Sequence, residues 1–117
     1  MVLDPDTLRP FLGNRTSGLS EPAIKPVALR VVAEVAEAVS LPLTGMGGVV
    51  SGRDVLEFIA CGALAVALGA ATFADPGAPE QVVRELAAEM TVRGLDRLEQ
   101  VRGRVFAMHA SAIHERP

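Results

Sequence analysis

The chain has 117 residues, a formal net charge of −3 and one cysteine, so it forms one domain or less and carries no basic field for nucleic acid. A single cysteine excludes an internal disulfide and a multi-cysteine metal cluster, and it is typical of a reducing cytoplasm. We expect a soluble cytoplasmic chain with no membrane contact, because no apolar run reaches the roughly 20 residues of a membrane span and the start lacks a signal-peptide pattern.

The first predicted helix follows a long loop. Residues 1–22 are expected to be loop because prolines, glycines and small polar residues interrupt the apolar ones. Lys25 is expected to be a solvated lysine beside the helix start, and Pro26 is suited to the first helical position. The helix should run for about four turns, to Val39. Its apolar residues recur at helical spacing: Ala28, Val31, Val32, Val35, Ala36 and Val39.

Residues 41–73 predict a β-strand, a helix and a second parallel strand, each strand ending in glycine. The first strand runs into Gly47 and Gly48, and the second runs into Gly69. Glycine at a strand end allows backbone N–H groups to approach a phosphate closely, although plain turn glycines are equally compatible with the spacing. Ser51 is expected to cap the helix, with Asp54 three residues later. The buried face of this helix should comprise Val55, Phe58, Ile59 and Gly62.

Two more helices are predicted after residue 73. The first is begun by Pro79 and ended by Gly94, with an apolar stripe of Val83, Leu86, Ala87 and Met90. The second is expected to start at Asp96, with Glu99 completing a capping box. Its stripe would be Leu98, Val101, Val105, Met108 and Ala112. The expected division is thus a loop at 1–22, strand and helix units with phosphate-binding turns at 23–94, and a C-terminal helix at 95–117.

The order of these elements indicates an incomplete α/β fold. Two parallel strands cannot make a sheet that is buried on both faces. A complete (β/α)8 TIM barrel needs about 250 residues, and its phosphate site frequently uses the loops after the seventh and eighth strands. We therefore predict the C-terminal portion of such a barrel: its last two strands, their helices and the preceding helix.

Three motifs resemble one known family. They are residues 18–30 (GLSEPAIKPVALR), 45–49 (GMGGV) and 62–69 (GALAVALG). In this order and spacing they resemble the carboxy-terminal part of class 1 dihydroorotate dehydrogenases, over roughly residues 1–94. The IKP run at 24–26 is most similar to the NAD-linked subclass, whose catalytic subunit works with a partner that carries FAD and an iron–sulfur cluster.

The resemblance implies a flavin site at the top of the barrel, where the two glycine turns hold the phosphate of FMN. The matching positions are Gly47 and Gly48 after one strand, and Gly69 with Ala70 after the next. Besides Ser17-Gly18 in place of the family's double glycine, two departures from the family pattern matter. Glu21 stands where the family usually has glycine, and its carboxylate would repel a phosphate unless it turns outward. Ala70 stands where the family has threonine, which removes a hydroxyl that could bond the phosphate.

The resemblance assigns no catalytic residue to this chain. The family's cysteine base, substrate-binding asparagines and flavin-contacting lysine come from earlier strands, and Cys61 lies on the wrong element to replace the base. The spacing of His109 and His114 is not that of a helical zinc pair, so no metal ligand is assigned. Implied partners are the missing N-terminal barrel half or another copy of the chain, the electron-transfer subunit, and dihydroorotate as substrate with orotate as product.

Two other hypotheses remain open. One is a non-catalytic phosphate-binding or assembly module derived from a TIM barrel, which would bury its open sheet edge against another chain. The other is a different phosphate-binding barrel family, against which the GLS and IKP runs argue.

Overall fold

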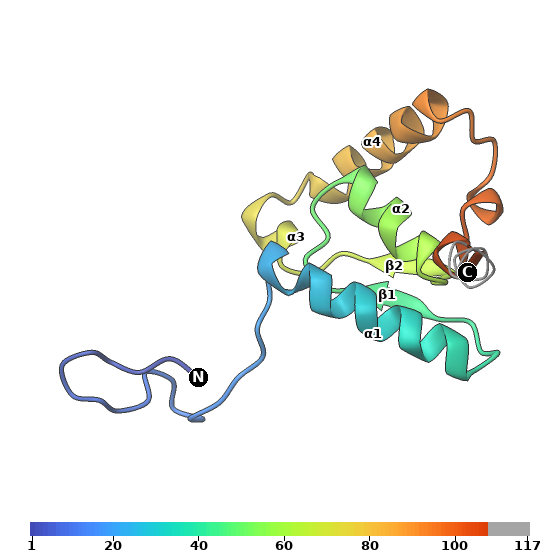
Figure 1. Cartoon of the computed structure of the whole chain (residues 1–117). Coiled ribbons are helices and arrows are strands. Elements are labelled where there is room, and N and C mark those ends of the chain that lie inside the picture. Colours follow the sequence, from blue (N-terminus) through green and yellow to red (C-terminus); the bar gives the residue numbers. More distant parts are fainter. Residues whose placement is uncertain (108–117) are drawn as a thin grey trace, which may run out of the picture.

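A computed structural model of the chain describes residues 1–107 (Figure 1). Residues 1–21 contain no helix and only a single antiparallel bridge between Leu3 and Pro10, and the segment stands away from the body. The elements that follow are η1 (Pro22–Ile24), α1 (Lys25–Ala38), β1 (Thr44–Met46), α2 (Gly52–Ala60), β2 (Ala65–Ala67), α3 (Ala71–Ala74), α4 (Ala78–Val92) and η2 (Leu98–Gln100). No helix among the described residues is long and apolar enough to cross a membrane.

The two strands form a parallel pair joined through α2, as the sequence predicts. Thr44 pairs with Ala65 and Met46 with Ala67, so the carboxyl ends of both strands lie at one edge of the sheet. α1 packs along β1, while α2 packs against both strands (Figure 1). The turns that leave the two strands are therefore neighbours.

The core of the molecule is the inner face of α2. Phe58 and Ile59 are fully buried, and Val55 is nearly so, which confirms the predicted face. The helix starts where Ser51 was expected to cap it: the Asp54 backbone N–H donates to Ser51 Oγ at 3.3 Å, and Ser51 N–H donates to Asp54 Oδ2 at 2.9 Å. This reciprocal pair satisfies two amides that the helix itself leaves without partners.

α4 crosses α2 at Gly52. A Cβ on Gly52 would lie 2.1 Å from the backbone nitrogen of Leu86, so only glycine allows this approach. The crossing turns Val82 into the core, where it is 2% exposed, and leaves Val83 65% exposed. The predicted stripe on this helix was therefore wrong in starting at Val83, because both valines lie one turn before Leu86 and only the packing against α2 chooses between them.

The predicted helix beginning at Asp96 is also wrong within the described residues. The chain instead forms η2 and a turn, in which Gly103 has a left-handed φ of 70°. The side chain of Gln100, not that of Glu99, accepts hydrogen bonds from the free backbone amides. Its Oε1 accepts from Asp96 N–H at 2.8 Å and from Arg97 N–H at 3.0 Å. The turn buries Val101 in the core, and the chain is helical again from residue 104. Met108 and Ala112 of the expected stripe lie outside the described residues.

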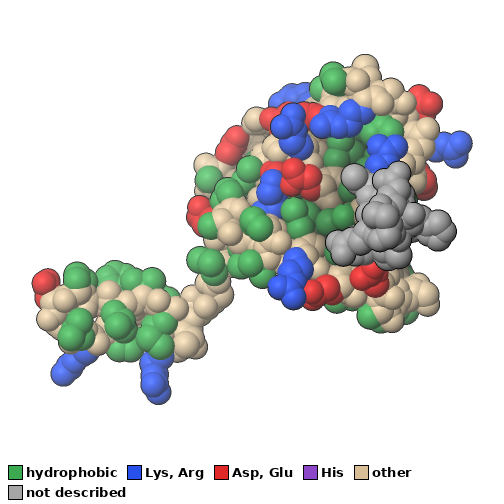
Figure 2. Space-filling model, in the orientation of Figure 1, with side chains coloured by type: hydrophobic (Ala, Val, Ile, Leu, Met, Phe, Trp, Pro, Cys, Tyr) green, Lys and Arg blue, Asp and Glu red, His purple; other side chains and the backbone are tan. Residues whose placement is uncertain are grey.

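The apolar residues of α1 divide between two faces, which corrects the prediction of one stripe. Ala28 and Val32 pack against the core, but Val27 and Val31 are 57% and 50% exposed, and Val35 is exposed as well. Figure 2 shows hydrophobic side chains at the surface of both the body and the N-terminal segment. α1 therefore presents a second apolar face that no described residue covers.

Candidate functional site

A pocket of about 480 Å³ lies at the carboxyl ends of the two strands. Its walls include residues 19–22 and Ile24, which lead into α1, the turn after β1, and the turn between β2 and α3. The five residues that the sequence predicts for a site all line this pocket: Glu21, Gly47, Gly48, Gly69 and Ala70. The fold thus brings together three segments that are far apart in the sequence.

The two glycines after β1 are required by the chain's own geometry. Gly47 and Gly48 have φ angles of +127° and +69°, which favour glycine. A Cβ on Gly47 would lie 2.8 Å from Ala28 Cβ, and one on Gly48 would lie 2.7 Å from the carbonyl oxygen of Glu21. Their presence is therefore explained by close packing of this turn against the segment that precedes α1.

Gly69 is different. No atom lies within 4 Å of a Cβ built on it, and its φ is outside the left-handed region, so the described chain does not itself require glycine here. The position opens into the pocket. A side chain at residue 69 would occupy space that is otherwise free for a ligand.

The short helix α3 follows directly and was missed by the sequence reasoning. Its first turn is closed by Thr72 N–H donating to the Gly69 carbonyl at 3.0 Å and by Phe73 N–H donating to that of Ala70 at 3.1 Å. No capping side chain precedes it, so the sequence carried no start signal. Ala70 and Ala71 at its start both line the pocket.

Glu21 has a backbone conformation that glycine adopts most easily. Its φ of 91° and ψ of 166° lie in a region that is essentially restricted to glycine. The Glu21 carbonyl accepts a hydrogen bond from Ile24 N–H at 3.1 Å, which closes η1. The departure that the sequence shows at this position therefore introduces backbone strain, and an acidic residue in place of glycine, among the residues that line the pocket.

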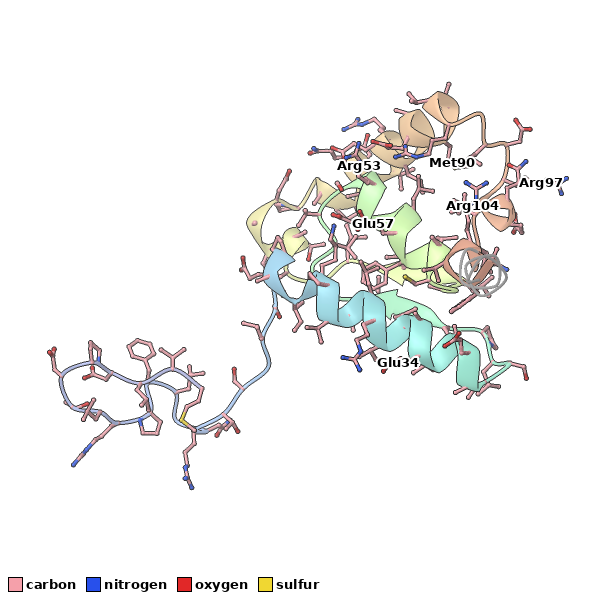
Figure 3. The ribbon with its side chains drawn as sticks, viewed as in Figure 1. Glu34, Arg53, Glu57, Met90, Arg97 and Arg104 are labelled. Atoms are coloured by element: carbon pink, nitrogen blue, oxygen red, sulfur yellow. The ribbon has the colours of Figure 1, made fainter. Side chains whose placement is uncertain are left out.

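Lys25 is not a solvated lysine, and that interpretation was wrong. Its Nζ lies 2.5 Å from Asp54 Oδ1 and 2.8 Å from Glu57 Oε2, and its side chain is 24% exposed. Figure 3 labels Glu57 on the side of α2 that faces the start of α1. Hydrogen bonds to Asp54 and then to Glu57 raise the pKa of Lys25 above its ordinary value.

Asp54 anchors the turn after β1, a role that the capping pattern did not predict. Its Oδ2 accepts from Val50 N–H and Ser51 N–H, both at 2.9 Å. Burial by itself would raise the pKa of Asp54, but the Lys25 ammonium and the hydrogen bonds from Val50 and Ser51 outweigh it and lower that pKa. The carboxylate thus stays charged beneath the pocket wall.

Cys61 caps the C-terminal end of α2 and does not line the pocket. It is partly buried, and burial together with the charge of Glu57 raises the pKa of its thiol. A raised pKa favours the unreactive thiol form, in keeping with a packing role. His109 and His114 lie outside the described residues, and within residues 1–107 no cluster of three metal-ligating side chains occurs.

Comparison with known proteins supports the family resemblance that the sequence motifs show. Residues 1–90 match the family model described as dihydroorotate dehydrogenase. The chain is 50% identical over 104 residues to the catalytic subunit of dihydroorotate dehydrogenase B (NAD(+)) of Bacillus mycoides, covering 89% of this chain and 34% of that protein. It is 47% identical over 114 residues to the corresponding Geobacillus subunit, covering 97% and 36%. The chain therefore spans about a third of the length of these relatives.

Solved structures match the fold. The ligand-free dihydroorotate dehydrogenase of Eimeria tenella superposes with a TM-score of 0.70 at 22% identity, over 97% of this chain and 30% of that one. The complex of that enzyme with ferulenol gives a TM-score of 0.72, also at 22% identity, over 91% and 29%.

The parallel strands, with a pocket at their carboxyl ends, are part of a (β/α)8 barrel, as predicted. The chain belongs to the dihydroorotate dehydrogenase family, and its sequence is consistent with the C-terminal region of the class 1 enzymes.

Proposed function

We propose that this chain supplies the C-terminal end of a dihydroorotate dehydrogenase barrel, which oxidises dihydroorotate to orotate in pyrimidine biosynthesis, and that its pocket holds the phosphate end of FMN. One observation carries the proposal: the four positions that the family resemblance marks for the phosphate meet in a single pocket, together with Glu21, although these five residues come from three separate segments. Such convergence at the carboxyl ends of parallel strands is the usual position of a barrel's ligand site.

The residues present fit an FMN phosphate in shape. A pocket of about 480 Å³ is within the range of about 300–1,000 Å³ for small-ligand sites. Gly47 and Gly48 on one side, and Gly69 with Ala70 on the other, would contact the phosphate through their backbones, with no Cβ at Gly69 to block the approach. FMN, when bound, would accept the hydride of the reaction. Glu21 is the one residue of the five that opposes an anion.

The remainder of the barrel would supply the catalytic groups. The resemblance places the base, the substrate amides and the flavin lysine on earlier strands, so we propose that this chain alone does not oxidise dihydroorotate. The exposed apolar face of α1, at Val27, Val31 and Val35, supports docking of the preceding barrel units, whichever polypeptide carries them. An electron-transfer subunit with FAD and an iron–sulfur cluster is proposed as a further partner, because the relatives named above are catalytic subunits.

Flavin fluorescence titration tests this function. FMN is titrated into the full chain alone, and then into the chain mixed with a polypeptide comprising the preceding barrel units of the Bacillus mycoides relative. We expect weak FMN binding by the chain alone, tighter binding in the mixture, and dihydroorotate oxidation only in the mixture. If FMN binds in neither sample, the phosphate-site proposal is wrong, and turnover by the chain alone would place catalytic groups within it.

A non-catalytic phosphate-binding or assembly module is the second candidate, favoured by the exposed face of α1 and by the presence of the acidic residue Glu21 among the residues that line the pocket. Light scattering and a titration with inorganic phosphate distinguish the two candidates. A stable self-associated form that binds phosphate as tightly as FMN would favour the module, whereas a preference for FMN would favour the barrel end.

A further inference from the structure

We infer that Asp54 is a positioning residue that holds the two walls of the pocket together. For its ligand this inference rests on the function proposed above. Asp54 does not itself line the pocket. It acts through Val50, which lines one wall, and Lys25, which adjoins the neighbouring wall.

One oxygen of the carboxylate fixes the turn after β1. Asp54 Oδ2 accepts from Val50 N–H and Ser51 N–H at 2.9 Å, and Val50 lines the pocket two residues after Gly48. Two amides on a single oxygen define the direction in which this turn leaves the strand. The turn's own glycines leave its backbone with more freedom than other residues would, so an outside constraint is needed.

The other oxygen fixes the adjacent wall. Asp54 Oδ1 lies 2.5 Å from Lys25 Nζ, and Lys25 begins α1 immediately after η1. Glu21, Pro22 and Ile24, just before it, line the pocket. The contact joins residues 29 positions apart, so it sets the separation of two segments that the local sequence does not hold together.

Burial makes this link specific to aspartate. Asp54 is 5% exposed, and a buried charge that loses its partners is strongly unfavourable. An asparagine is uncharged and has only one accepting oxygen, so it cannot form the ion pair with the lysine and gives the two amides at best a weaker acceptor. Asp54→Asn therefore weakens the links to both walls while it preserves the size of the side chain.

Amide hydrogen exchange on the full, ligand-free chain tests the geometry. Exchange at Val50 and Ser51 should accelerate about tenfold in Asp54→Asn, since their acceptor is lost or weakened. Glu57→Gln is the matched control, because Glu57 pairs with Lys25 at 2.8 Å but accepts from neither amide. Exchange at these two amides should stay as in the wild type in that control. Unchanged exchange in Asp54→Asn would overturn the inference.

A comparison of FMN with riboflavin separates positioning from general stability. Riboflavin lacks the phosphate, so a variant that only loosens the fold should weaken the binding of both flavins by the same factor. We expect Asp54→Asn to weaken the binding of FMN about tenfold more than the binding of riboflavin. Glu57→Gln should leave the ratio of the two affinities, FMN to riboflavin, unchanged. An unchanged ratio in Asp54→Asn, in a chain whose wild type binds FMN, would overturn the positioning role.

Two further results keep the test decisive. If Asp54→Asn does not fold, Lys25→Met is the alternative variant, because it releases the wall that precedes α1 and keeps the hydrogen bonds from the two amides to Asp54. It should lower the ratio of FMN affinity to riboflavin affinity and leave amide exchange at Val50 unchanged. If the wild type fails to bind FMN but the exchange effect at Val50 and Ser51 is present, the link between the walls is supported and the proposed cofactor role is wrong.

Discussion

Gly48 and Glu21, which both line the pocket, pack against each other through their backbones, since a Cβ on Gly48 would lie 2.7 Å from the Glu21 carbonyl oxygen. Both residues have positive φ, 69° and 91°, but only one of them is glycine. The contact is possible because Gly48 has no side chain, and Glu21 remains strained because it has one. Backbone strain at residue 21 therefore lowers the stability of the fold, and a glycine at this position would remove that strain.

Glu21→Gly is expected to stabilise the chain by about 1 kcal/mol, because relief of about 1–3 kcal/mol of backbone strain exceeds the entropy cost of a glycine. Urea denaturation measures the change in the free energy of unfolding. FMN should also bind more tightly, since a carboxylate is removed from the pocket.

Glu21→Gln is the control for that variant. It removes the charge but keeps the strained φ, so FMN binding should improve while the free energy of unfolding stays the same. Equal stability of the glycine and glutamine variants would contradict the strain at this residue.

Gly69→Val should abolish measurable FMN binding, because the branched side chain would fill the open approach to the pocket. The free energy of unfolding should change by less than about 0.5 kcal/mol, since no atom of residues 1–107 lies within 4 Å of the new Cβ. Gly13→Val is the matched control: its Cβ also meets no atom of the described residues within 4 Å, and it lies outside the pocket. FMN affinity that survives Gly69→Val would show that Gly69 is only a turn residue.

Ala70→Thr is expected to tighten FMN binding about tenfold, which corresponds to one hydrogen bond to a charged group at about 1.5 kcal/mol. Ala70 lines the pocket at the start of α3, where a hydroxyl could reach a phosphate oxygen. Ala70→Val has the same shape without the hydroxyl and should give no gain. A fluorescence titration in which threonine and valine behave alike would argue against a phosphate at this position.

Stability should depend on pH through the ion pair of Asp54 and Lys25. The folded pKa of Asp54 is lowered, so its contribution is present above the unfolded value of about 3.9 and is lost as pH falls through the folded pKa. The folded pKa of Lys25 is raised, so its contribution is present below the unfolded value of about 10.4 and is lost as pH rises through the folded pKa.

Urea denaturation across the acid range, on the wild type and on Asp54→Asn, measures the carboxylate's share. The free energy of unfolding should fall less steeply with decreasing pH in the variant, because a titrating group with a lowered pKa is absent. Parallel acid slopes in the two proteins would mean that Asp54 titrates alike in the folded and unfolded chains.

The sequence by itself determined the local features of the fold, whereas the positions expected at the pocket came from the family resemblance. The capping pair of Ser51 and Asp54, the buried face at Phe58 and Ile59, and the helix end at Gly94 were all predictable. Each depends on residues within a few positions of one another, or on the period of a single helix, and such signals need no knowledge of the partner surface.

Only the tertiary structure decided which residues meet across the fold. The pairing of Lys25 with Asp54, the burial of Val82 in place of Val83, and the positive φ of Glu21 follow from how η1, α1 and α4 pack against the α2 unit. The turn at Gly103 and the burial of Val101 likewise replace the predicted beginning of the last helix. A charge has no preferred partner, and an apolar residue no preferred side, until two surfaces come together, because the stabilising contacts are made between elements distant in the sequence.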